Sequence, residues 1–142
     1  MSITNLIKRL PPFVFTITVV LAVLYLTLMP DPLPDNDISL FPGADKVVHA
    51  IMMLGVIGCL ALDYLRKHPG RTKAPGALLI IFCIATTAFG GAIELVQGSM
   101  DMGRGEDIYD FYADTAGALL GLFIAYALWT KVNRWIFGDR QS

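Results

Sequence analysis

Four long apolar segments occupy most of this chain, and they limit its possible folds more than any other feature. They lie at about residues 13–29, 47–65, 75–96 and 111–130. Each approaches the roughly 20 residues that an α-helix needs to cross a bilayer, and the ~10-residue alternating segments of a membrane β-barrel are absent. Because unpaired backbone groups are very unfavourable in hydrocarbon, the spans are predicted to be helices. We therefore expect an all-α membrane protein, a single domain over residues 1–142 built as a bundle of four transmembrane helices.

The composition agrees with a chain that lies in lipid. Hydrophobic residues make up 55% of the sequence and charged residues only 16%, whereas about a quarter of an ordinary soluble domain is charged. The formal net charge of −1 lacks the basic excess that marks nucleic-acid binding, so we expect no nucleic-acid partner. Both cysteines, Cys59 and Cys83, fall within apolar segments and lack the short spacing of metal ligands, so they are predicted to be small core residues.

The basic residues predict how the helices are oriented in the membrane. They gather before the first span, between the second and third spans, and after the last span. These residues are Lys8, Arg9, Arg66, Lys67, Arg71, Lys73, Lys131, Arg134 and Arg140. The other two connections are acidic, with Lys46 and Arg104 as their only basic residues. Because lysine and arginine concentrate on the cytoplasmic side, we expect a multi-pass protein of the cytoplasmic membrane with both termini in the cytoplasm.

Polar residues gather at the outward-facing ends of three of the spans and in the third connection. The predicted ligand-binding residues are Asp45, Lys46, His49, Glu94, Gln97, Arg104, Asp107, Asp110 and Asp114. The last three aspartates recur at helical spacing and continue along the same side of the helix into Gly117 and Gly121. Such a glycine pair lets a neighbouring backbone approach closely. It would bring the aspartates against another helix, and it also offers a surface for a homo-oligomer.

The cluster holds more acids than bases. Its five carboxyl groups exceed its two permanently charged cations, Lys46 and Arg104. An ionisable group at membrane depth costs at least ~2.5 kcal/mol unless it faces protein or water, so the arrangement indicates a binding site. The alternative is that the cluster only clamps the helices together.

Three agents would balance the excess of acid. They are protons bound through raised pKa values, a divalent cation held by carboxylate oxygens with or without His49, and the cationic part of a ligand. The sequence does not distinguish among these three agents, so no cofactor is assigned. For a metal, several acids with one histidine favour magnesium, calcium or manganese over a closed structural zinc site.

Three motifs, taken together, resemble those of the VanZ-like family of bacterial membrane proteins. They are Asp45-Lys46-Val47-Val48-His49, Glu94-Leu95-Val96-Gln97, and Arg104 followed by Asp110, Asp114 and Gly117-Ala118-Leu119-Leu120-Gly121. The resemblance runs from about residue 30 to residue 121. It implies a small protein of the bacterial inner membrane, linked to resistance to the glycopeptide antibiotic teicoplanin without remodelling of the peptidoglycan precursor termini.

These observations leave three functions open. The first is an outward-facing site for a membrane lipid, a lipid-linked envelope precursor or an amphiphilic antibiotic, in which Lys46 and Arg104 hold a lipid phosphate. The second is a non-catalytic protein whose charged cluster is structural or binds a partner. The third is a small proton-coupled transporter, although no inverted repeat is visible. No nucleophile or phosphatase motif is present, so enzymatic activity is not favoured and no catalytic residue is assigned.

Overall fold

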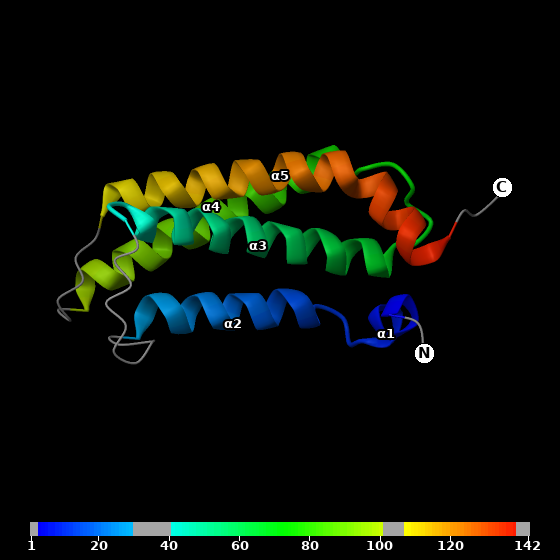
Figure 1. The fold of residues 1–142 in the computed structure, drawn as a ribbon, viewed down its shortest axis with the longest axis horizontal. Coiled ribbons are helices and arrows are strands. Elements are labelled where there is room, and N and C mark those ends of the chain that lie inside the picture. The colour runs from blue at the N-terminus through cyan, green and yellow to red at the C-terminus, as the bar shows by residue number, and fades with distance from the viewer. Residues whose placement is uncertain (1–2, 30–40, 101–106, 139–142) are drawn as a thin grey trace.

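The chain folds into helices throughout the part that the structure describes. The computed structural model describes residues 3–29, 41–100 and 107–138. Its helices are α1 (Ile3–Arg9), α2 (Val14–Leu28), α3 (Ala44–Lys67), α4 (Gly76–Ser99) and α5 (Ile108–Phe137). Figure 1 shows α2, α3 and α5 running side by side along the long axis, with α4 crossing behind α3 and α5. The predicted all-α class is therefore confirmed.

Three of the helices, α3, α4 and α5, are long and apolar enough to cross a membrane. The helices α1 and α2 meet the same criterion only as a pair, and they are bent by 83° at the break between them. The break contains Pro11 and Pro12, which lack the N–H group that a continuous helix needs. By itself α2 has 15 residues, roughly 22 Å of helix, which is less than the ~30 Å hydrocarbon core. The structure thus gives three spans, or four if the bent pair is one span, where the sequence predicted four.

The helices α3 and α5 form the closest pair in the bundle. A Cβ atom added at Gly117 would lie 2.1 Å from the carbonyl oxygen of Ala50, and one at Gly121 would lie 3.1 Å from Cβ of Ile57. The glycine pair therefore does what its spacing predicts, because it lets the backbone of α5 rest on α3. Both glycines are buried in this contact, so this face of α5 is already covered within the chain.

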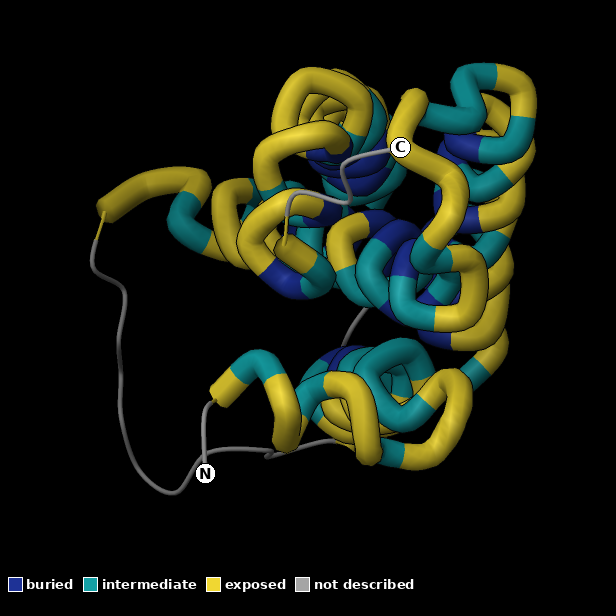
Figure 2. The backbone as a smooth tube through the Cα atoms, turned by 90° about the vertical axis from the view of Figure 1, so that its right-hand side faces the viewer, coloured by how far each residue is buried: buried dark blue, intermediate teal, exposed yellow. Residues whose placement is uncertain are grey.

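The core lies between the helices, and the outer faces are apolar. One cluster of buried side chains includes Met53, Ile57 and Cys83, and a second is built around Leu79 and Trp129. In Figure 2 the buried stretches face inward between the helices and the exposed stretches face outward. Many large apolar side chains on those outer faces are exposed, as expected for a bundle whose solvent is lipid.

A buried ion pair within α3 includes the aspartate that also binds α2, at the end of the bundle opposite the acidic cluster. Arg66 Nη1 donates to Asp63 Oδ1 at 2.7 Å, one turn away on α3. The other oxygen, Asp63 Oδ2, accepts from the backbone N–H of Thr16 at 2.9 Å and from its hydroxyl at 2.8 Å. Because the first N–H groups of a helix lack partners within it, Asp63 caps α2 from the neighbouring helix.

Candidate functional site

The predicted site residues meet at one end of the bundle, where α3 and α5 begin and α4 ends (Figure 1). Seven of them contact at least one other member of the cluster. These residues are Asp45, Lys46, His49, Glu94, Asp107, Asp110 and Asp114. Gln97 lies at the same end but donates to the carbonyl of Thr27 at 2.9 Å, so it joins α4 to α2. Arg104 lies outside the described residues.

Local backbone features start the two helices at this end. Gly43 precedes α3 in the left-handed conformation with φ 83°, which glycine adopts without the steric cost that other residues meet. Asp107 is the N-cap of α5, and its Oδ1 accepts from the backbone N–H of Tyr109 at 2.8 Å. The backbone N–H of Asp107 in turn donates to Glu94 Oε2 at 3.1 Å. This contact ties the start of α5 to the last turns of α4.

The outer layer of the cluster is one ammonium group surrounded by three carboxyl groups. Lys46 Nζ lies 2.8 Å from Asp45 Oδ2, 2.9 Å from Asp107 Oδ2 and 2.9 Å from Asp110 Oδ1. A lysine ammonium has three donors, so each donor faces one acid. The hydrogen bond from Lys46 holds the pKa of Asp107 below its usual value. The outer layer therefore joins α3 to α5 through a single base.

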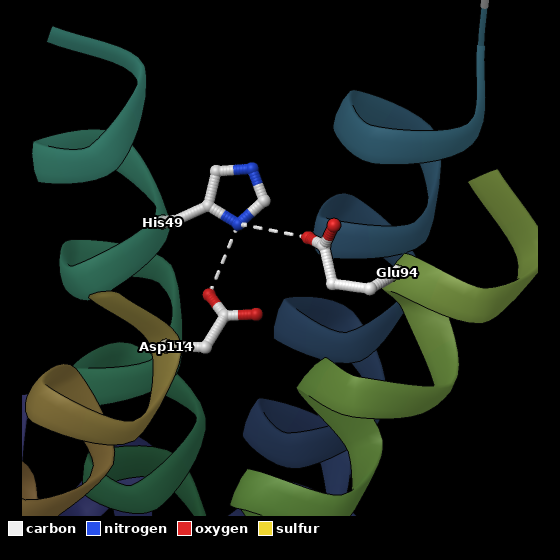
Figure 3. A group of neighbouring side chains, drawn as sticks. All are labelled: His49, Glu94 and Asp114. Atoms are coloured by element: carbon white, nitrogen blue, oxygen red, sulfur yellow. Dashed lines mark hydrogen bonds and ion pairs between the residues drawn. The ribbon is translucent and has the colours of Figure 1, made fainter. Parts of the chain in front are cut away.

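The inner layer consists of His49, Glu94 and Asp114, one residue from each of α3, α4 and α5 (Figure 3). His49 Nδ1 lies 3.0 Å from Asp114 Oδ1 and 3.9 Å from Glu94 Oε1. The exposed fractions of the side chains are 11% for His49, 8% for Glu94 and 0% for Asp114. Asp110 connects the two layers, because its Oδ2 lies 3.8 Å from His49 Nε2.

Two carboxylate oxygens of the inner layer have no hydrogen-bond partner within the described residues. They are Glu94 Oε1 and Asp114 Oδ2, and both are buried. Gly90 leaves room for the second, since a Cβ atom there would lie 2.5 Å from it. Burying a carboxylate oxygen without a partner is strongly unfavourable. A proton, a cation or a ligand donor at this position would remove that cost.

Two groups of residues in the cluster have the geometry to hold a metal ion. His49, Glu94 and Asp114 each offer one ligand atom, and so do Asp45, Asp107 and Asp110, with the atoms of each group within 4.8 Å of one another. The second group surrounds Lys46, whose ammonium already supplies positive charge. The first group has no lysine or arginine partner within the described ranges.

A cleft between α4 and α5 reaches the cluster, and nothing in the sequence indicated it. Its volume is about 730 Å³. It is lined by Ala88, Gly91, Ala92, Glu94, Leu95, Asp107, Ile108 and Phe111. Its walls are apolar apart from the two acids. A second groove, between α3 and α5, is lined by residues such as Leu54 and Trp129 and includes no member of the cluster. The first cleft is therefore the one that bears on the site.

Comparison with known proteins gives one match. A family model described as VanZ/LLP1 matches residues 2–130. No curated protein and no solved structure matches the chain. The family match covers α1 to α4 and most of α5, and every residue of the predicted site lies within it.

Proposed function

Since this chain belongs to the VanZ/LLP1 family, we propose that this membrane protein binds an amphiphilic molecule of the cell envelope at the end of its helix bundle. The observation that carries the proposal is the cleft between α4 and α5. Its apolar walls suit an acyl or aryl group, and its two polar residues, Glu94 and Asp107, belong to the acidic cluster. Ligand sites commonly combine an apolar lining with a few placed polar groups.

The head of the ligand is proposed to carry hydrogen-bond donors or positive charge. Glu94 Oε1 and Asp114 Oδ2 are acceptors without partners in the described part of the chain, and a donor group would satisfy them. Lys46 was expected to hold a lipid phosphate, but each of its three donors faces a carboxyl group. A phosphate at Lys46 would have to displace an acid, so the structure favours an amine-rich or hydroxyl-rich head.

The proposed orientation places this site outside the cytoplasm, with four crossings and both termini inside. The distribution of lysine and arginine supports it. Contact between the two ends of the described chain supports it as well, because α1 packs on α5 and Lys8 Nζ lies 5.4 Å from the centre of the Phe137 ring. Ends on the same side require an even number of crossings. A reporter active only outside the cytoplasm should be silent after residue 142 and active between 101 and 106, and the reverse result would overturn this orientation.

A blocked cleft tests the binding proposal directly. Ala92→Phe places a ring in the cleft, whereas Ala85→Phe adds the same ring to an exposed position of α4 outside it. Protein purified in mild detergent is analysed for co-purifying lipid by mass spectrometry, and cells expressing each variant are tested for growth in teicoplanin. We expect the Ala92 variant to lose both retained amphiphile and any protection, and the Ala85 variant to keep them. Identical results for the two variants would exclude the cleft as the binding site.

Charge-neutral substitutions separate a binding site from a purely structural cluster. Glu94→Gln and Asp110→Asn keep the size of each side chain and remove its charge. We expect both variants to reach the membrane folded and to lose ligand retention. If both keep full retention and protection, the alternative of a structural or partner-binding cluster is favoured.

A further inference from the structure

The acids of the cluster are unequally supplied with positive charge. Lys46 contacts Asp45, Asp107 and Asp110. Glu94 and Asp114 are the two most buried acids of the cluster, and neither contacts a lysine or an arginine within the described residues. Their shared neighbour is His49, whose imidazole is neutral in one of its two protonation states. The centre of the cluster therefore lacks a permanent cation where two carboxylates meet.

The carboxyl groups of this centre converge on one nitrogen atom. Figure 3 shows the carboxyl groups of Glu94 and Asp114 approaching the same ring nitrogen of His49 from two different helices. Glu94 Oε1 and Asp114 Oδ2 have no hydrogen-bond partner in the described structure, and their side chains are only 8% and 0% exposed. Two buried carboxyl groups that contact one imidazole nitrogen, each with an oxygen that lacks a partner, offer more acceptors than this part of the chain has donors to satisfy.

We propose that His49 Nδ1, Glu94 and Asp114 bind one divalent transition-metal ion. The ligand atoms lie within 4.8 Å of one another, and the contacts from Nδ1 measure 3.0 and 3.9 Å. Ligands about 2.0–2.2 Å from a shared tetrahedral ion stand about 3.3–3.6 Å apart, so small side-chain adjustments suffice. Two carboxylates and a neutral imidazole balance the charge of a divalent ion.

The surroundings of His49 fit the role of a metal ligand. Asp110 Oδ2 lies 3.8 Å from Nε2 on the far side of the ring, where a carboxylate attracts the ring proton. Nδ1 is hydrogen-bonded to Asp114 Oδ1 at 3.0 Å. An ion bound at Nδ1 would replace this contact and leave the ring proton on Nε2, facing Asp110, as in other sites where a carboxylate orients a metal-bound histidine. Lys46 holds Asp110 through its other oxygen at 2.9 Å. The outer layer thus positions the inner one.

The donor set narrows the choice of ion. Carboxylates suit Mg²⁺, Ca²⁺ and Mn²⁺, whereas an imidazole nitrogen suits Zn²⁺ and Fe²⁺, so a mixed set of two carboxylates and one imidazole fits Mn²⁺ or Zn²⁺. No cysteine is near, since Cys59 and Cys83 contribute to neither ligand group. Three protein ligands leave at least one coordination position open, which is the pattern of reactive or ligand-binding sites. We assign Mn²⁺ or Zn²⁺ to this centre ahead of Mg²⁺.

Metal titration of the full-length protein tests the assignment without any amphiphile. Protein in detergent is stripped with EDTA and titrated with Mn²⁺, Zn²⁺ and Mg²⁺ by calorimetry. We expect one Mn²⁺ or Zn²⁺ per chain, with Mg²⁺ binding more weakly. Glu94→Gln and His49→Gln should each weaken binding by more than about 100-fold, beyond the 10–100-fold typical of residues that only orient a ligand. Ser99→Ala, at the same end of α4 but in neither ligand group, should bind as the wild type does.

Spectroscopy of the unaltered protein provides a test that does not depend on a folded variant. Bound Mn²⁺ should show electron–nuclear coupling to a single imidazole nitrogen. Absence of stoichiometric metal, absence of the nitrogen coupling, or wild-type affinity in Glu94→Gln would each overturn the proposal. The ion would use the carboxyl groups that the proposed function offers to the head of the amphiphile, so both proposals concern one site and are tested separately. Amphiphile retention is measured separately on the EDTA-treated protein, and retention without metal binding would reject the metal site alone.

Discussion

Gly117 is the position at which one added methyl group tests the packing that builds the site. A Cβ atom there would lie 2.1 Å from the carbonyl oxygen of Ala50 and 2.7 Å from its carbonyl carbon and its Cα. Ordinary contact begins at 3.4 Å, so Gly117→Ala requires α3 and α5 to separate by roughly 1 Å. Because all three atoms belong to the backbone, no side-chain rotation relieves the clash.

Two opposing effects set the change in the free energy of unfolding of Gly117→Ala, and Gly58→Ala serves as its matched control. Alanine favours a helix over glycine by about 1 kcal/mol, whereas overpacking costs typically about 1–3 kcal/mol. At Gly117 the added atom would meet backbone atoms, so we expect the overpacking cost to lie at the upper end of this range. The net result is a loss of about 2 kcal/mol in the free energy of unfolding. A Cβ atom at Gly58 in α3 meets nothing within 4 Å. Gly58→Ala therefore keeps the gain in helix propensity without the clash.

Equilibrium unfolding in detergent, followed by circular dichroism of the helices, measures the difference. Gly117→Ala should unfold at a lower denaturant concentration than the wild type, and Gly58→Ala at the same or a higher one. His49 is the neighbour of Ala50, and Asp114 lies one turn before Gly117, so the separation should also weaken Mn²⁺ binding. Equal unfolding midpoints for the two variants would refute the close packing of α3 on α5.

Three further outcomes are expected. Gly90→Ala places a Cβ atom 2.5 Å from Asp114 Oδ2, so it should weaken metal binding at least about 10-fold in the calorimetric titration without changing any charge; unchanged affinity would contradict the inner-layer geometry. Asp63→Ala leaves the buried guanidinium of Arg66 without its ion pair and α2 without its cap, and should lower the free energy of unfolding by about 3–5 kcal/mol; a loss below 1 kcal/mol in detergent unfolding would argue against the pair. The pKa of Asp107 lies below its ordinary value of 3.8 because of the neighbouring ammonium. Its stabilising contribution is present above pH 3.8 and is lost as the pH falls through the lowered value, so acid titration should erase the difference in stability between wild type and Asp107→Asn, and a difference that persists at lower pH would rule this out.

Much of the fold followed from the sequence, because membrane helices leave few choices. The predicted spans 47–65, 75–96 and 111–130 correspond to α3, α4 and α5, which extend beyond them because polar residues continue a helix past its apolar stretch. The acids were expected to meet at one end of the bundle because helices that follow one another through short connections run antiparallel. The close approach at Gly117 followed from small residues spaced one turn apart.

The details of the site depended on geometry that spacing does not specify. The direction of Lys46 depends on the relative rotation of α3 and α5, and this rotation gives it three acids in place of a phosphate. Hydropathy placed one span at 13–29 but could not show the 83° bend between α1 and α2 or the cap that Asp63 supplies. The cleft beside Glu94 arises where small side chains of α4 face α5, a pairing visible only once the helices are placed.

The single base of the outer layer makes that layer unequally tolerant of mutation. Asp45 contacts Lys46, its side chain is 57% exposed, and its loss would leave two acids around the ammonium. Loss of Lys46 would instead remove the common partner of three acids and leave them facing one another. A saturation-mutagenesis scan should accept many residues at position 45 and very few at position 46. Arginine should be among those rejected, since its planar fork does not arrange three donors around one nitrogen.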